Sequence, residues 1–106
     1  MQQITATQLR DLLADPTAKP EMLDVREPWE WQLAHIDGAR HVPMGQVPVH
    51  AEGWDRAQPR VVICHHGMRS LQVVAFLERQ GFTHLHNLQG GIDAWSRLVD
   101  PRVPTY

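Results

Sequence analysis

The sequence of 106 residues has one cysteine, Cys64, so it cannot form a disulfide within the chain. We therefore expect a reducing compartment, the cytoplasm, and an external acceptor for whatever Cys64 picks up. An excess of charge of one sign is also missing, since 10 lysines and arginines face 12 aspartates and glutamates. Because this balance provides no basic surface, nucleic acid is not expected as a partner.

Long apolar runs are absent as well. The first residues, Met1–Thr7, have neither the cationic start nor the apolar stretch of an export signal. No run of about 18 apolar residues occurs elsewhere, and we expect no membrane association. With 42% hydrophobic residues and a length that suits one core, residues 1–106 are expected to form a single, monomeric domain.

Short apolar runs alternate with amphipathic stretches along the chain. Strands are predicted at residues 22–25, 40–42, 61–63 and 83–88. Helices are predicted around residues 9–13, 28–33, 71–80 and 92–98. The weak pattern of residues 44–58 predicts a short helix or an irregular segment that covers one edge of the core. Strands that alternate with helices predict a small α/β domain with a mainly parallel sheet.

Cys64 lies between the most apolar predicted strand and the longest predicted helix. In this position loop amides and the helix N-terminus would face the sulfur and stabilise a thiolate. Gly67 lets the loop curl, and Arg69 places a positive charge at the rim, where it would attract an anionic substrate. Asp24 and Arg26 end a neighbouring predicted strand and should reach the same rim. These residues predict that Cys64 is a nucleophile.

Four stretches resemble the rhodanese-like sulfurtransferase family, in its small single-domain branch. Cys64–Ser70 is similar to its active-site loop, Leu23–Glu30 to its D-V-R-E-P-x-E signature, His35–Ala39 to its G-H-I-x-G-A turn and Asn87–Trp95 to its L-x-G-G-x-x-A-W close. Together they cover most of residues 22–97 in the family's order. Ala34 stands where the family usually has glycine, which suggests a slightly different path into the turn.

The resemblance implies a fold around a five-stranded parallel sheet and the activity of a thiosulfate sulfurtransferase. Cys64 would take the outer sulfur of a donor such as thiosulfate, release sulfite and pass the sulfur from its persulfide to cyanide or a cellular thiol. Asp24 and Arg26 would support the rim. No cofactor and no metal is expected. The backbone amides that would hold the persulfide belong to His65, His66, Gly67, Met68, Arg69 and Ser70.

Two other functions stay open. Cysteine phosphatases and the related arsenate reductases separate Cys and Arg by five residues, and their arginine grips oxyanion oxygens. Here four residues separate Cys64 from Arg69, so the loop closes a smaller cradle that suits one sulfur atom. In an oxyanion enzyme Asp24 or Asp37 would be the general acid. In a non-catalytic rhodanese-like binding module, Cys64 would be a buried packing residue.

Several residues also have structural interpretations. Asp24 and Arg26 could form an ion pair with Glu30 or with the loop backbone as well as shaping the rim. His65 and His66 either assist the thiolate by charge and proton donation or supply backbone amides alone. The four tryptophans are interpreted as packing residues. A metal site from Cys64, His65, His66, His84 and His86 fits no standard zinc spacing.

Overall fold

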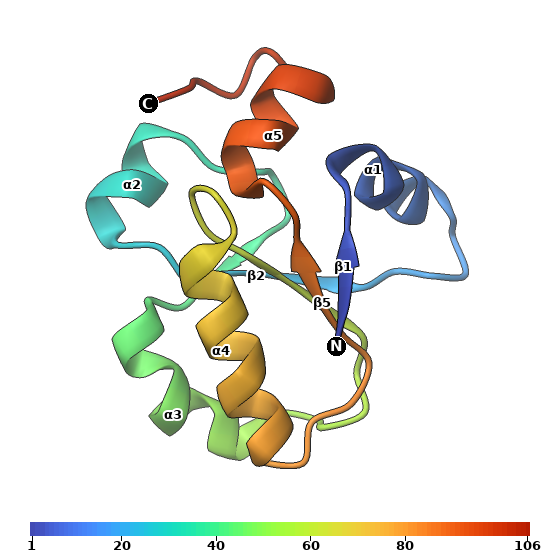
Figure 1. Ribbon diagram of the computed structural model, residues 1–106, viewed down its shortest axis with the longest axis vertical. Helices are drawn as coiled ribbons and strands as arrows, with labels where there is room; N and C mark the ends of the chain where they lie inside the picture. The colour runs from blue at the N-terminus through green and yellow to red at the C-terminus, as the bar shows by residue number, and fades with distance from the viewer.

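A five-stranded parallel sheet runs through the computed structural model, which describes all residues from Met1 to Tyr106 (Figure 1). Its strands are β1 (Gln2–Ile4), β2 (Glu21–Asp24), β3 (Arg40–His41), β4 (Arg60–Ile63) and β5 (Leu85–Leu88). Their order across the sheet is β1-β5-β4-β2-β3, and every neighbouring pair is parallel. The prediction of an α/β domain with a parallel sheet is confirmed.

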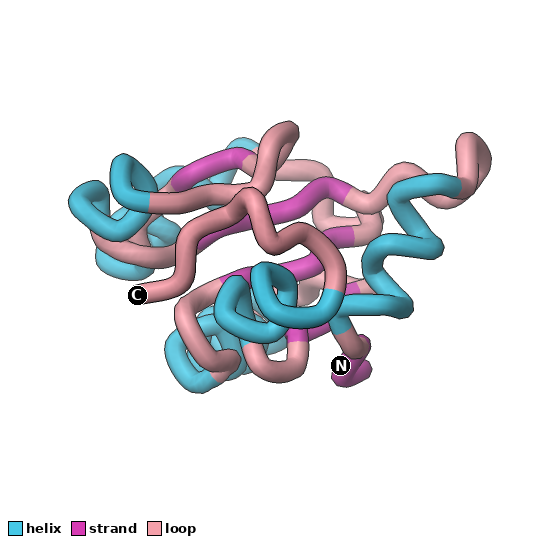
Figure 2. The backbone as a smooth tube through the Cα atoms, turned by 90° about the horizontal axis from the view of Figure 1, so that it is seen from above, coloured by secondary structure: helices cyan, strands magenta, loops and turns pink.

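Helices connect the strands and cover both faces of the sheet (Figures 1 and 2). They are α1 (Ala6–Ala14), α2 (Pro28–Leu33), α3 (Val47–His50), α4 (Met68–Arg79) and α5 (Gly91–Leu98), with 3-10 turns at Met44–Gln46 and Ala51–Gly53 on either side of α3. Thr5 caps α1 through a reciprocal capping box with Gln8, and Pro28 starts α2. None of these helices is long and apolar enough to cross a membrane.

Two hydrophobic clusters lie on opposite faces of the sheet, and β4 contributes to both. Val62 and Cys64 belong to the cluster under α3 and α4, whereas Val61 and Ile63 belong to the cluster under α1 and α5. This alternation follows from the period of two along a strand. Because β4 is central and has all four residues buried, Cys64 sits at the end of the most enclosed strand.

Helix α4 ends at Arg79, one residue before the predicted end of this helix. Gly81 adopts φ +89°, and its N–H donates to the carbonyl of Glu78 at 3.0 Å. The N–H of Phe82 donates to the carbonyl of Leu77, also at 3.0 Å. This pair of bonds is a Schellman motif, which satisfies carbonyls of the last turn.

Some elements differ from the prediction. Strand β1 was not predicted, because its residues are mostly polar and pair only at the edge of the sheet, with β5. Strand β5 begins at Leu85 because His84 adopts φ +59°, outside the extended region. Val49 and Trp29 were expected to pack in or at the edge of the core, but their exposed fractions are 73% and 62%. Val49 points outward because α3 buries Val47 instead.

Adjacent parallel strands bring two predicted site segments together. Asp24 of β2 pairs in register with Ile63 of β4, the residue before Cys64. The chain therefore leaves both strands at the same rim of the sheet, as the sequence predicts. In Figure 1 the loop after β4 lies between α2 and α5 at this rim.

Candidate active site

The sulfur of Cys64 is enclosed by the loop that joins β4 to α4, and the residue is 1% exposed. The N–H of Gly67 donates to Cys64 Sγ at 3.0 Å, the one loop amide that hydrogen-bonds to this atom. Gly67 has φ +104°, a conformation that favours glycine. Helix α4 begins at the next residue, so the positive end of its dipole lies beside the sulfur. This backbone geometry favours negative charge at Sγ.

Ser70 supplies the second polar contact of the sulfur. Its Oγ lies 3.3 Å from Cys64 Sγ and donates a hydrogen bond to Oδ1 of Asn87, at the C-terminal part of β5. The Asn87 amide donates to the carbonyl of Gly67 at 3.2 Å and to Gln3 Oε1 at 2.9 Å, which fixes the amide orientation. Because the single hydroxyl proton of Ser70 is used by Asn87, Oγ faces the thiol as an acceptor.

The back of the loop rests on the N-terminal end of α5. The N–H of Ile92 donates to the carbonyl of Cys64 at 2.9 Å, and the N–H of Asp93 donates to the carbonyl of His65 at 3.1 Å. Gly91 has φ +59°, and a Cβ at this position would overlap both carbonyl oxygens. Only glycine fits such a close approach of two backbones. Helix α5 thus fixes where Cys64 lies.

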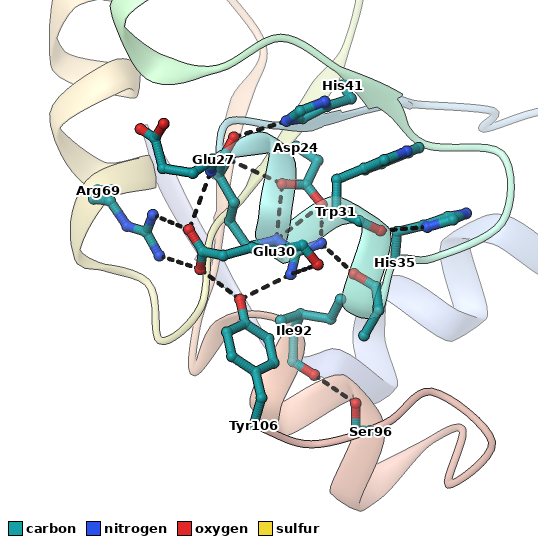
Figure 3. Close-up of polar contacts among 12 residues, drawn as sticks. Asp24, Glu27, Glu30, Trp31, His35, His41, Arg69, Ile92, Ser96 and Tyr106 are labelled. Atoms are coloured by element: carbon teal, nitrogen blue, oxygen red, sulfur yellow. Dashed lines mark hydrogen bonds and ion pairs between the residues drawn. The ribbon is translucent and has the colours of Figure 1, made fainter.

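Arg69 forms a two-point ion pair with Glu30 of α2 (Figure 3). Its Nη1 donates to Oε1 at 2.6 Å and its Nη2 to Oε2 at 2.9 Å. Arg69 chiefly, then Tyr106 and the N–H of Glu27, lower the pKa of Glu30 to about 2 against the opposing effect of burial. The sequence predicts a positive charge of Arg69 at the rim, and in the structure this charge is paired with the carboxylate of Glu30.

Asp24 and Arg26 form a buried ion pair, with side chains 1% and 0% exposed. Arg26 Nη2 donates to Asp24 Oδ2 at 2.7 Å, and Nε lies within 3.1 Å of both carboxylate oxygens. The other donors of Arg26 reach the carbonyls of Glu30 and Ala34 and the hydroxyl of Tyr106. The pair therefore braces α2 under the rim, and its contact with Glu30 is to the backbone carbonyl rather than the carboxylate.

His65 and His66 stack on each other, with ring centroids 3.9 Å apart. Burial chiefly, together with the charge of His66, lowers the pKa of His65, so its ring is neutral around pH 7. Nitrogens of these two rings and a carboxylate oxygen of Asp93 all lie within 4.8 Å of one another. The residues that could approach a metal ion are thus these three, whereas Cys64, His84 and His86 do not join them.

Met68, the remaining loop residue, is 72% exposed at the start of α4 and presents an apolar side chain beside the loop. The sequence did not predict that four further residues contact the loop or its ion pairs: Glu30, Asn87, Gly91 and Tyr106. The first three lie inside stretches that resemble family signatures, which was the available signal. Nothing in the sequence pointed to Tyr106, because its contacts are with residues far away along the chain.

Comparison with known proteins adds to this geometry. Residues 5–98 match the model of the Rhodanese-like domain family. The probable adenylyltransferase/sulfurtransferase MoeZ of Mycobacterium tuberculosis is 37% identical over 106 residues, with 97% of this chain and 26% of that protein covered. The thiosulfate sulfurtransferase GlpE of Pseudomonas aeruginosa is 33% identical over 100 residues, with 94% of this chain and 87% of that protein covered. The chain thus spans about a quarter of MoeZ and most of GlpE.

Solved structures have the same architecture. SSP1007 from Staphylococcus saprophyticus superposes with a TM-score of 0.84 at 31% identity, covering 93% of this chain and 97% of the other. A rhodanese-like domain protein from Staphylococcus aureus gives a TM-score of 0.85 at 27% identity, covering 100% and 99%. The sheet topology, the order of the sequence motifs and these similarities agree. The chain belongs to the rhodanese-like domain family.

Proposed function

We propose that this chain is a sulfurtransferase, which moves a sulfane sulfur from a donor such as thiosulfate to a thiophilic acceptor. The carrier would be a persulfide on Cys64. The observation that carries the proposal is the placement of the chain's one thiol, at the head of a loop where a backbone N–H and a helix N-terminus meet it. The relatives named as sulfurtransferases support the same assignment.

In the first step the thiolate of Cys64 attacks the outer sulfur of thiosulfate. A sulfur–sulfur bond forms to Cys64 as the bond within thiosulfate breaks, and sulfite leaves with the electron pair of that bond. In the second step cyanide or an external thiolate attacks the outer persulfide sulfur and regenerates the Cys64 thiolate. Charge balances in both steps, and no second cysteine is needed, which agrees with the single thiol of the chain.

The residues around the sulfur would have separate roles. The Gly67 N–H and the N-terminus of α4 stabilise the thiolate and then the persulfide, whose outer sulfur is anionic. Ser70 Oγ accepts a hydrogen bond from the thiol or, after rotation of the hydroxyl, donates one to the thiolate. Arg69 uses two of its five N–H donors for Glu30, so three remain for an anionic donor. Asp24 and Arg26 hold α2 in place below the rim.

An intact-mass measurement tests the proposal directly. The protein incubated with thiosulfate and freed of excess reagent should gain the mass of one sulfur atom. Cyanide should then restore the original mass and release thiocyanate in equal amount. The variant Cys64→Ser removes only the nucleophile and should show no gain.

Absence of an adduct with thiosulfate and with several other sulfane donors would overturn the assignment. Cys64-dependent turnover of an aryl phosphate or of arsenate, without a persulfide, would favour an oxyanion enzyme instead. If the protein forms no persulfide and turns over neither of these substrates, the remaining interpretation is a non-catalytic binding module.

A further inference from the structure

The segment that follows α5 runs back toward α2 (Figure 1), and its residue Tyr106 stacks on His65 of the Cys64 loop. The N–H of Asp100 donates to the carbonyl of Trp95 at 2.9 Å, and the N–H of Val103 donates to the carbonyl of Asp100 at 3.1 Å. Val103 and Tyr106 then pack against the core cluster under α1 and α5. This turn and its packing direct Tyr106 toward α2 and the residue after Cys64.

The phenol of Tyr106 links the two ion pairs of the site (Figure 3). Its hydroxyl donates to Glu30 Oε2 at 2.6 Å and accepts from Arg26 Nη1 at 2.8 Å. Burial chiefly, and then the Glu30 carboxylate, raise the pKa of Tyr106 to about 12, so the phenol keeps its proton at neutral pH. Each oxygen of Glu30 thus accepts two hydrogen bonds, one from Arg69 and one from Tyr106 or from the N–H of Glu27.

The ring of Tyr106 packs on His65, the residue next to Cys64. It stacks on His65 with the centroids 4.0 Å apart and the planes 5° from parallel. Trp29 packs its edge against Tyr106, at 5.9 Å and 76°. One side chain therefore contacts both the carboxylate that orients Arg69 and the imidazole that follows Cys64.

We propose that Tyr106 is a positioning residue that sets the preference of the site for anionic sulfur donors, an inference that rests on the proposed sulfur transfer for its substrate class. The phenol disperses the negative charge of Glu30 and fixes the carboxylate. Arg69, whose side chain is 34% exposed, then keeps its three remaining donors in one orientation at the rim. Without the phenol, the negative charge of Glu30 is less compensated. The carboxylate that pairs with Arg69 is also held less firmly in one orientation. Both changes slow the approach of an anion to Cys64.

Two alkylating reagents test this without requiring sulfur transfer. Iodoacetate and iodoacetamide carry the same reacting group and differ by one negative charge, and Cys64 is the only thiol they can reach. Tyr106→Phe removes the hydroxyl and keeps the ring, so it is expected to fold. We expect it to lower the ratio of iodoacetate to iodoacetamide rates about three- to fivefold, the scale of one lost hydrogen bond. The iodoacetamide rate should stay within about twofold of the wild type, since the loop is unchanged.

A second variant separates the ring from the hydroxyl. Tyr106→Leu removes both, so the imidazole of His65 loses its stacking partner and Cys64 becomes easier to reach. We expect the iodoacetamide rate itself to rise in this variant, whereas the ratio falls as in Tyr106→Phe. Thr105→Ala, an exposed and uncharged change at the adjacent residue, is the matched control and should leave both rates unchanged.

The same variants carry the inference to the substrate. Tyr106→Phe should raise the KM for thiosulfate several-fold with kcat nearly unchanged, and added salt should reduce the difference from the wild type. An unchanged reagent ratio, or equal slowing of both reagents, would overturn the role of Tyr106. A wild type that forms no persulfide would defeat the proposed function instead, while the ratio still decides whether Tyr106 positions the charges.

Discussion

Two arginine–carboxylate pairs flank the rim, and they differ in how completely their hydrogen bonds are used. Arg26 is fully buried and directs Nε and both terminal nitrogens to Asp24, two carbonyls and the phenol of Tyr106. Arg69 is 34% exposed and makes two hydrogen bonds, both to Glu30. The first pair has no donor left for a ligand, whereas the second has three.

This difference gives the two arginines different roles, one in supporting the fold and one in meeting a substrate. A buried guanidinium is stable only when every donor has a partner, so Arg26 can brace the fold but cannot meet a substrate. A part-exposed guanidinium tolerates spare donors because water can satisfy them, and those donors are free to meet an anion. The sequence alone placed both arginines at one rim, Arg69 to attract an anion and Arg26 to support the rim, but it did not show how buried each one is. The structure distinguishes them by burial.

Removing Arg26 should have the largest effect. Arg26→Leu leaves the carboxylate of Asp24 buried without its partner, and we expect the free energy of unfolding to fall by roughly 3–5 kcal/mol. Urea denaturation followed by circular dichroism measures this loss. The double variant Asp24→Leu/Arg26→Leu should recover part of the stability, because it removes the unpaired charge. A loss below about 1 kcal/mol in the single variant would erase the distinction between the two pairs.

Removing Arg69 should cost less. Arg69→Leu leaves Glu30 with the hydrogen bonds of Tyr106 and the Glu27 N–H, and we expect a loss of roughly 1–3 kcal/mol. The variant should still fold and should bind thiosulfate more weakly. Urea denaturation and the KM for thiosulfate are the two measurements. A stability loss as large as that of Arg26→Leu would assign Arg69 to the scaffold.

Acid should remove the contribution of the Arg69 pair. The folded-state pKa of Glu30 is lowered to about 2 from an ordinary value of 4.5, so the unfolded chain binds the proton first as the pH falls. The pair therefore stabilises the protein above about pH 4.5, and this stabilisation is lost between about pH 4.5 and 2. The gap in stability between the wild type and Arg69→Leu should shrink over this range. A gap that is constant from pH 6 to pH 3, in about 0.1 M salt, would contradict the ion pair.

Alkaline pH should lower the stability of the protein through Tyr106, and this is the smallest of the expected effects. The folded-state pKa of Tyr106 is raised to about 12 from 10, so the folded protein holds this proton longer than the unfolded chain does. Stability should consequently decline between about pH 10 and 12. Tyr106→Phe has no proton to lose at this position and should decline less. Equal declines in stability of the wild type and of Tyr106→Phe would contradict the proposal that the phenol connects the two ion pairs.

Features that depend on neighbouring residues could be read from the sequence. The helix start at Pro28 and the helix end near residue 80 each depend on signals within one turn of the backbone, and both predictions are confirmed. The loop from Cys64 to Arg69 was also recognisable, because its residue types and spacing are local.

Features that depend on contacts between distant segments could not be predicted from the sequence. Burial of Arg26 and pairing of Arg69 with Glu30 require β2, α2 and α4 to be placed first, and a charged residue has the same local pattern in either case. Strand β1 lacks an apolar pattern because an edge strand is held mainly by hydrogen bonds to its neighbour. Tyr106 acts from a turn whose direction is set by packing on α5.

The close contact of Gly91 with the loop also limits where the loop can grow. The carbonyls of Cys64 and His65 are pressed against the start of α5, so an inserted residue has no space on that side. An insertion that lengthens the spacing to Arg69 from four residues to five must be absorbed near His66 and Met68, whose side chains face solvent. Laboratory evolution toward a larger, oxyanion-sized cradle should therefore accept insertions in this short stretch and reject them directly after Cys64.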